Sequence, residues 1–142
     1  MLKGSHQVFV LALIALGLSA SFWFSPSAAN AAGQHSFPVK QYDAFHDVLH
    51  PLQHEALPKN DFKTIRAQSR LLVKRGTAIV SLGIPRSVIK DQRGEFGVEL
   101  RKFSKALAKF RADARTGTDD QLKTSFSAVH DSFEMLAGMV RV

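Results

Sequence analysis

The sequence contains no cysteine among its 142 residues. This absence excludes a disulfide framework, a zinc ribbon, an iron–sulfur cluster and covalently attached c-type haem. The chain also lacks G-x-S-x-G, phosphate-loop and H-E-x-x-H motifs, and no carboxylate pair is placed for glycoside chemistry. We therefore expect a protein that is not an enzyme.

Charged residues make up 22% of the chain and hydrophobic residues 45%, which is typical of an ordinary globular protein. The length accommodates one domain. Lys and Arg outnumber Asp and Glu by 19 to 12, which gives a net charge of +7. A basic excess of this size is typical of a solvated surface, and it also favours attraction to anionic membranes or cell-wall polymers.

An almost wholly apolar run, VFVLALIALGLSASFWF, occupies residues 8–24 near the N-terminus. Lys3 precedes this run, and an A-x-A motif follows it at 29–31. This pattern predicts a secretory signal peptide, with cleavage after Ala31 or, alternatively, after Ala29. An uncleaved N-terminal anchor is the other interpretation, because the run is close to the lower length limit for spanning a bilayer.

Cleavage after Ala31 removes Lys3, which leaves 18 Lys and Arg against 12 Asp and Glu. The predicted organisation is a signal peptide at 1–31, a flexible lead at 32–38 and a helical domain at 39–142. Export predicts a periplasmic or secreted protein that is not an integral membrane protein and has no nucleic acid as its partner. The oligomeric state is not indicated by the sequence.

Four amphipathic stretches follow the lead, with most proline and glycine residues between them. Residues 118–121 form a capping box, with Thr at the N-cap and Gln at the third helical position. We predict helices from about Val39 to Leu57, from the Asn60-Asp61 cap to near Gly83, from about Gln92 to Thr116, and from Thr118 almost to the C-terminus.

Apolar residues recur three and four positions apart in these stretches, as in helices with one buried face. Two of the three connections are short, which favours antiparallel neighbours. The predicted fold is therefore all-α, an antiparallel up-down-up-down four-helix bundle. The predicted buried positions are Phe45, Leu49, Leu52 and Ala56; Phe62, Ile65, Leu72, Val73 and Val80; Phe96, Leu100, Phe103, Leu107, Phe110 and Ala114; and Leu122, Phe126, Val129, Phe133, Leu136 and Val140.

Histidines give the main functional signal. His46, His50 and His54 recur every four residues, so their side chains lie along one side of a helix. Neutral imidazole is the commonest metal ligand. At about 100° per residue, His46 and His130 lie on facing flanks of the first and last helices at matching heights. The sequence predicts a copper, zinc or nickel ion bound by His46, His50 and His130, with His54 and Glu134 as secondary ligands.

Other interpretations of these residues are open. His54 rotates outward and is expected to be exposed, and Pro51 interrupts the helical hydrogen bonds and disturbs the register. Flank histidines are also common as plain surface residues. Glu55 is a further carboxylate beside a histidine. Met135 and Met139 are spaced to bind Cu(I), but we expect Met135 to point away from the buried face and Met139 to fill a gap.

The stretches HPLQHEALPKND (50–61) and VHDSFEML (129–136) resemble uncharacterised periplasmic proteins that look like haemless relatives of the cytochrome c′ family. The resemblance covers most of the mature chain, in architecture alone. Cytochromes c′ are exported four-helix bundles that hold haem near the end of the last helix through C-x-x-C-H. This chain has His130 at the corresponding place but no cysteine, so the resemblance implies the bundle without covalent haem.

Two functions from different classes follow. The first is a periplasmic metal-binding bundle that acts as a carrier, buffer or sensor. The second is a non-catalytic interaction or structural module of the cell envelope, which binds an envelope protein through the basic face of the third helix or the grooves of the bundle. A small ligand in the core, such as noncovalent haem, is a third possibility. The position of His130 relative to His46 and His50 discriminates between the first two.

Overall fold

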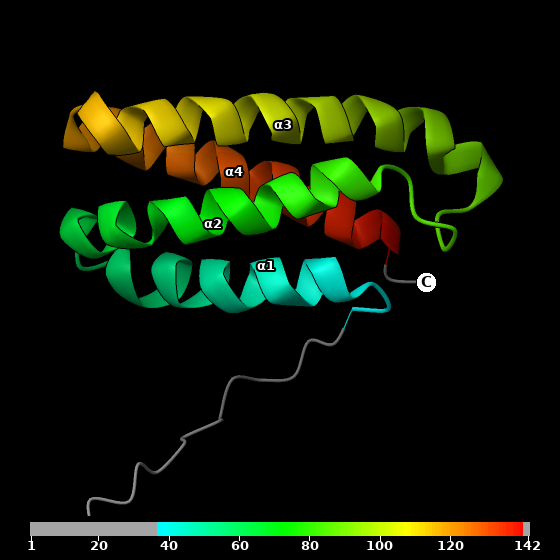
Figure 1. Ribbon diagram of the computed structural model, residues 1–142, viewed down its shortest axis with the longest axis horizontal. Coiled ribbons are helices and arrows are strands. Elements are labelled where there is room, and N and C mark those ends of the chain that lie inside the picture. The colour runs from blue at the N-terminus through cyan, green and yellow to red at the C-terminus, as the bar shows by residue number, and fades with distance from the viewer. Residues whose placement is uncertain (1–36, 141–142) are drawn as a thin grey trace, which may run out of the picture. The chain divides into compact units, whose positions relative to one another are not determined.

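A computed structural model describes residues 37–140, which form four long helices and two short helical turns (Figure 1). The predicted signal peptide and His35 lie outside the described residues. The described part contains no strand, and the predicted all-α class with four helices is confirmed. The elements are α1 (Lys40–Pro51), the π-helical turn η1 (Leu52–Ala56), α2 (Phe62–Leu82), the 3₁₀ turn η2 (Lys90–Gln92), α3 (Arg93–Thr116) and α4 (Asp119–Val140).

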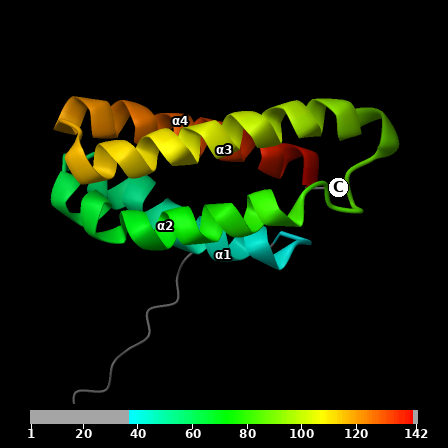
Figure 2. The ribbon, with the colours of Figure 1, turned by 45° about the horizontal axis from the view of Figure 1, so that its top comes forward.

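The four helices lie side by side along one long axis (Figures 1 and 2). The α1–α2 and α3–α4 connections lie at one end, and the longer α2–α3 connection lies at the other. α2 packs beside both α1 and α3, and α3 packs beside α4. Between residues 37 and 140, no helix combines the length and the apolar character needed to cross a membrane.

A cluster of aromatic rings fills the space between α1, α3 and α4. Phe133 is at its centre, with ring centroids 4.7 Å from Phe45, 5.9 Å from Tyr42 and 6.4 Å from Phe103. Phe37, which precedes α1, adds a fifth ring at 5.9 Å from Phe133. All five rings are buried. Burying an aromatic side chain stabilises the fold by several kcal/mol, about 3–5 by truncation to alanine, so this cluster is a main source of stability.

α2 packs through aliphatic side chains, and at Gly76 its backbone closely approaches side chains of α1 and α3. Leu72 and Ile79 are fully buried. Gly76 is buried between them, and a Cβ atom there would lie 2.6 Å from a methyl of Leu107 and 3.1 Å from the ring of Phe45. The absence of a side chain at Gly76 therefore permits this contact.

Two of the helices, α2 and α4, begin at the predicted capping residues. The Asp61 side chain accepts a hydrogen bond from the Thr64 N–H at 3.0 Å and begins α2. The Thr118 N–H donates to Gln121 Oε1 at 2.8 Å, and the Gln121 N–H donates to Thr118 Oγ1 at 3.2 Å, so the predicted capping box is confirmed. Gly83 ends α2 with a φ of 73°, in the left-handed region that glycine adopts readily.

The predicted flexible lead at 32–38 does not extend to Phe37. This side chain is 4% exposed, and its backbone N–H donates to Asp43 Oδ1 at 2.6 Å. The sequence prediction assigned Phe37 to the lead because no helical period includes it. Burial of its ring in the aromatic cluster offsets the entropy lost on ordering the backbone here.

The buried face of α2 was only partly predicted. Its centre runs along Ile65, Leu72, Gly76 and Ile79, and the prediction omitted the last two. Because apolar residues cover more than half of the circumference of α2, their spacing alone does not locate the centre of its buried face. On the other three helices, every predicted position is buried except Leu100. The predicted positions that are only half-buried are Phe62, Val73 and Val80 of α2 and Leu100 of α3.

Candidate functional site

Three histidines form a column on one flank of α1 and η1, called the histidine column below. The ring centroids of His46 and His50 lie 5.3 Å apart, and those of His50 and His54 lie 4.5 Å apart. His46 and His50 are half-buried, and His54 is exposed, as its helical rotation predicts. Each neighbouring pair of imidazoles is close enough to supply two nitrogen ligands to one metal ion.

His54 lies in the π-helical turn η1, directly after the α-helical segment that contains His50. Pro51 has no backbone N–H and interrupts the α-helical hydrogen bonding. Beyond it, the Leu57 N–H donates to the Leu52 carbonyl at 2.9 Å, five residues back. The second pair of the column, His50 and His54, therefore spans the change from α-helical to π-helical hydrogen bonding.

His46 is the member of the column that contacts α4. Its ring stacks on Phe133, with centroids 6.3 Å apart and an interplanar angle of 27°, and it also meets the Phe37 ring at 5.7 Å. His130 lies one turn before Phe133 on α4, and its Nδ1 is 3.1 Å from Asp131 Oδ1. The structure therefore brings His46 against α4 through an aromatic ring and places His130 beside an acid of its own helix.

The other predicted ligands are spread over the surface. Glu134 and Glu55 are exposed. Met135 is 51% exposed and Met139 is 8% exposed, which confirms that Met135 points away and Met139 fills a gap. Across residues 37–140, no group of three or more His, Cys, Asp or Glu side chains is placed to hold a metal ion. The column offers pairs of histidines, and the site shared with His130 stays a prediction.

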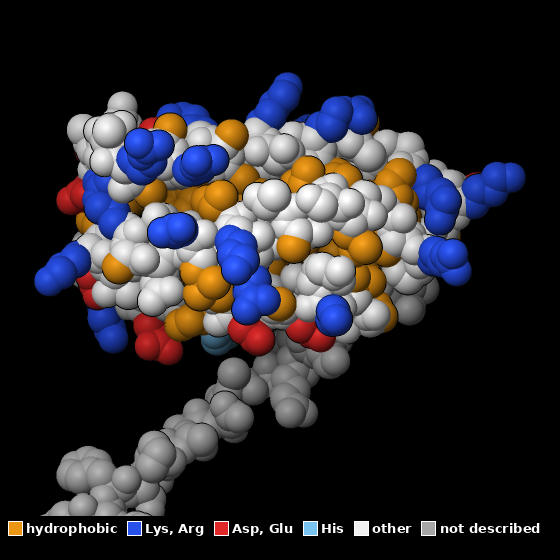
Figure 3. Space-filling view, viewed as in Figure 1, with side chains coloured by type: hydrophobic (Ala, Val, Ile, Leu, Met, Phe, Trp, Pro, Cys, Tyr) orange, Lys and Arg blue, Asp and Glu red, His pale blue; other side chains and the backbone are white. Residues whose placement is uncertain are grey.

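Charge is divided between two pairs of helices. α2 contains five Lys and Arg residues and no Asp or Glu. α3 contains seven Lys and Arg residues and three Asp and Glu residues. In contrast, α1 and η1 together contain three Asp and Glu residues and one Lys. α4 contains four Asp and Glu residues and one Lys. Figure 3 shows Lys and Arg over α2 and α3, with Asp and Glu along the edge over α1. The histidine column therefore lies in the acidic half, whose field attracts cations.

A groove of about 440 Å³ lies beside the column, between α1–η1 and α2. Asp47 and Glu55 line it from the same elements that carry the histidines, and Asp61 lines it from the start of α2. Lys59 is the one cation among its lining residues. These carboxylates add to the negative potential around the column.

A second groove, of about 470 Å³, lies between α2 and α3. Arg70 and Lys74 line it from α2, and Arg111 and Arg115 line it from α3. These four cations were not among the site residues predicted from the sequence. The sequence feature that could have identified them is two pairs of cations, with the members of each pair four residues apart. Each pair lies on one of two helices that pack together.

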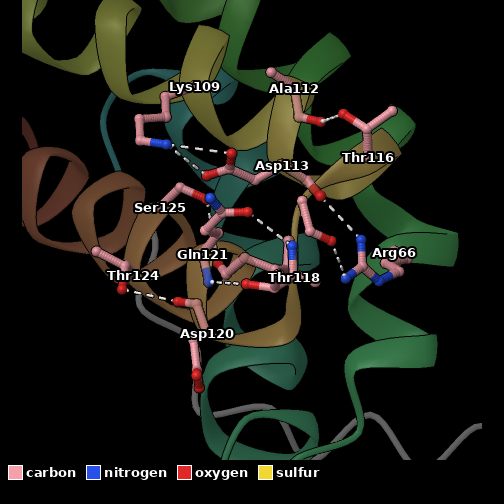
Figure 4. Close-up of polar contacts among 12 residues, drawn as sticks. Arg66, Lys109, Ala112, Asp113, Thr116, Thr118, Asp120, Gln121, Thr124 and Ser125 are labelled. Atoms are coloured by element: carbon pink, nitrogen blue, oxygen red, sulfur yellow. Dashed lines mark hydrogen bonds and ion pairs between the residues drawn. The ribbon is translucent and has the colours of Figure 1, made fainter.

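The largest polar cluster ties three helix ends together (Figure 4). Arg66 Nη1 donates to the carbonyl oxygens of Asp113 at 2.9 Å and Ala114 at 3.2 Å. Arg66 Nη2 donates to the Gly117 carbonyl and to Asp119 Oδ1, both at 2.9 Å. Carbonyl groups in the last turn of a helix have no partner within that helix. Arg66 therefore caps α3 and links it to α2 and α4.

Asp113 belongs to the same cluster and is 8% exposed. Lys109 Nζ donates to its two carboxylate oxygens at 2.9 and 3.2 Å. Hydrogen bonds from Lys109 and then Ser125 lower the pKa of Asp113, because they favour its charged form. These groups hydrogen-bond one another, so we assign the cluster to the stability of the fold.

Comparisons with known proteins assign no family to this chain. No protein-family model, no curated protein and no solved structure matches it. The resemblance to haemless relatives of cytochrome c′ therefore stays an interpretation of the sequence, and a functional proposal rests on the geometry described above.

Proposed function

We propose that the protein binds a copper, zinc or nickel ion through the histidine column and acts as a carrier, buffer or sensor outside the cytoplasm. The observation that supports this function is the separation of the rings, 5.3 Å for His46 and His50 and 4.5 Å for His50 and His54. Two imidazoles provide half of a four-coordinate site, and water completes it. A site this open exchanges its ion readily, which suits a carrier or buffer.

His130 is a candidate third ligand, with Glu134 as a fourth. A metal-ligating histidine usually donates its other ring N–H to a carboxylate, which fixes the tautomer. The contact between His130 Nδ1 and Asp131 at 3.1 Å is of this kind, and it leaves Nε2 available for a ligand. We propose that an ion bound by His46 and His50 recruits His130 across the α1–α4 side.

The proposal includes the topology and the export of the chain. Connections at alternate ends of the helices support an up-down-up-down bundle, the architecture of the cytochrome c′ family (Figure 1). Export requires the signal peptide at 1–31, with the uncleaved anchor as the alternative. Mass spectrometry of the chain recovered from the periplasm or medium tests this part, and a mature chain that begins at Ala32 supports it.

Calorimetric titration with Cu(II), Zn(II) and Ni(II) tests the metal site. His50→Ala should weaken binding most, because His50 belongs to both pairs of the column. His130→Ala should also weaken binding, and unchanged binding in this variant would show that the column holds the ion without α4. Gln68→Ala, which changes an exposed residue of α2, is the control. The proposal fails if the parent and His50→Ala bind all three metals equally weakly.

Acidity and thermal stability give two further readouts. Imidazole must be deprotonated to bind a metal, so the affinity should fall steeply between about pH 7.5 and 5.5. An ion that binds only the folded chain should raise the melting temperature. At about 100 times the dissociation constant, it adds roughly 2.7 kcal/mol to the free energy of unfolding. A melting temperature that is unaffected by metal would favour the alternative, an interaction or structural module of the envelope.

A further inference from the structure

The groove between α2 and α3 is lined by cations on both sides. Arg70 and Lys74 of α2 face Arg111 and Arg115 of α3, and Val73 contributes apolar surface. No carboxylate is among the described residues that line this groove. Figure 3 shows the apolar strip between the two helices with Lys and Arg side chains on each side. The groove therefore presents concentrated positive charge next to apolar atoms.

These four cations are not neutralised by the fold. In the described part of the chain, none of them makes an ion pair or a side-chain hydrogen bond. Two acids of α3 are already paired, Glu99 with Lys102 at 2.7 Å and Asp113 with Lys109 at 2.9 Å. Because α2 contains no Asp or Glu, the charge of the groove is available to an external anion.

Exposed apolar side chains gather at the far end of the same two helices. Pro85 and Val88 are buried and hold the α2–α3 connection against the bundle. The residues beside them point outward, with cations next to them in sequence at Arg86 and Lys90. The exposed apolar residues at this end are Leu82 at 40%, Ile84 at 39%, Ile89 at 49% and Val98 at 41%.

We propose that the α2–α3 half of the bundle docks on a bilayer that contains anionic phospholipids. Guanidinium groups pair with headgroup phosphates in a bidentate manner, which suits Arg70, Arg111 and Arg115. Exposed apolar side chains among cations are typical of proteins that lie on a membrane surface, and a soluble polyanion would not use them. This inference is independent of metal binding, because the histidine column belongs to the other half.

The orientation follows from the division of charge. The basic pair of helices is attracted to the negative surface, and the acidic pair, α1 and α4, is repelled by it. The docked protein therefore presents α2 and α3 to the lipid and directs α1 and α4 away from it. An experiment that measures orientation separates this docking from membrane binding by the apolar run at residues 8–24.

A single fluorescent label on the full chain measures this orientation. Because the chain has no cysteine, Ala108→Cys and Ala128→Cys each provide one labelling site. Both alanines are exposed. Ala108 lies on α3 and lines a neighbouring groove that shares Val73 and Arg111 with the basic groove, and Ala128 lies on α4. Each labelled chain is mixed with phosphatidylcholine vesicles and with equimolar phosphatidylcholine–phosphatidylglycerol vesicles. We expect a blue shift at position 108, only on the anionic vesicles, and its reversal by salt.

Paired variants with equal change in net charge locate the contact. Arg111→Gln/Arg115→Gln should weaken partitioning to the anionic vesicles roughly 25-fold, at about five-fold for each cation removed. Lys40→Gln/Lys123→Gln removes the same charge from the acidic half and should leave partitioning nearly unchanged. The variant Ile84→Ser/Ile89→Ser should cause a smaller loss, with Met135→Ser as its control.

Three results would each overturn the proposal. The first is an equal shift at positions 108 and 128. The second is an equal response to neutral and anionic vesicles, which would assign binding to the apolar N-terminal run. The third is an equal loss of partitioning in the two double variants, which would show a dependence on net charge alone. An acidic protein as the true partner would leave position 108 unshifted on both vesicles, which also counts against docking on lipid.

Discussion

The two helix pairs of this four-helix protein, α1 with α4 and α2 with α3, share the same helical period but differ in packing and charge. α1 and α4 meet through aromatic rings centred on Phe133, and their outer surfaces carry acids and the histidine column. α2 and α3 meet through aliphatic side chains, the close approach at Gly76 and the cap formed by Arg66, and their outer surfaces are basic. Helix periodicity alone therefore does not determine how a helix packs or what its surface attracts.

This difference has a consequence for function. If a cation site and an anion-binding surface lay on the same helix pair, the charges of each would weaken the electrostatic potential at the other. Here most carboxylates near the histidines belong to α1, η1 and α4, and the cations of the basic groove belong to α2 and α3. The separation lets each surface keep its own potential, so variants of one half should leave the ligand of the other half bound.

The largest expected effect concerns the aromatic half. Phe133→Ala removes the ring that contacts Phe37, Tyr42, Phe45 and Phe103. The expected loss is about 3–5 kcal/mol in the free energy of unfolding, measured by urea denaturation. A chain of this size has about 5–15 kcal/mol in total, so the variant should melt far below the parent.

The control for this variant lies on the exposed surface of α3. Lys105→Ala should change the free energy of unfolding by less than about 0.5 kcal/mol. Lys105 is exposed and has no ion pair in the described part of the chain. Equal melting of Phe133→Ala and Lys105→Ala would contradict the assignment of the aromatic rings to the core.

The second effect concerns the cap of the basic half. Arg66→Ala removes four hydrogen bonds to the end of α3 and the start of α4. Because the Arg66 side chain is 29% exposed, water replaces some of these bonds, and we expect a loss of about 1–3 kcal/mol. Arg70→Ala, one turn later on α2, should lose under about 0.5 kcal/mol. Similar losses in the two variants would show that Arg66 does not cap α3.

Sequence patterns predicted the helices well where a local signal exists. The Thr118–Gln121 capping box and the Asp61 cap are local hydrogen bonds, so the sequence locates both helix starts. The aromatic and aliphatic positions of α3 and α4 follow a narrow stripe and were predicted almost completely. Phe37 and Gly76 were not predicted, because their burial depends on what packs against them from elsewhere in the chain.

The candidate site shows the same limit. The spacing of His46, His50 and His54 predicts a column, and the structure has one. The sequence indicated a disturbance at Pro51 but not its form, because a π-helical turn and a kink both follow from one missing hydrogen bond. The groove cations were missed because they belong to separate helices, and only the packing of α2 on α3 places them together.

A third effect should appear in acid and report on the basic half. The pKa of Asp113 is lowered from its ordinary value of 3.8, mainly by the hydrogen bond from Lys109. A carboxylate with a lowered pKa in the folded state contributes stability above its unfolded pKa, and the contribution is lost as the pH falls through the folded value. The parent should therefore lose stability below about pH 4.

Asp113→Asn is the variant that isolates this contribution. The difference in free energy of unfolding between the parent and Asp113→Asn should be constant near neutral pH and should shrink as the pH falls below about 4. Urea denaturation at several acidic pH values measures it. A difference that is the same at all pH values would show that the charge of Asp113 does not stabilise the fold.

The smallest effect concerns a hydroxyl in the aromatic half. Tyr42 is fully buried, and within the described residues its hydroxyl has no hydrogen-bond partner. Burial raises the pKa of Tyr42 above its ordinary value of 10.0, because the charged form loses its hydration. Tyr42→Phe keeps the ring contacts and removes the unpaired polar atom, so stability near neutral pH should stay equal or rise by up to about 1 kcal/mol.

The alkaline range distinguishes this interpretation from a simple gain in hydrophobicity. A raised pKa in the folded state gives stability that is fully present below the unfolded pKa and is lost as the pH rises above about 10. The parent should therefore destabilise in alkali more than Tyr42→Phe, measured by urea denaturation up to the highest pH at which the chain stays native. If Tyr42→Phe is less stable than the parent near neutral pH, the hydroxyl has a partner that stabilises the fold.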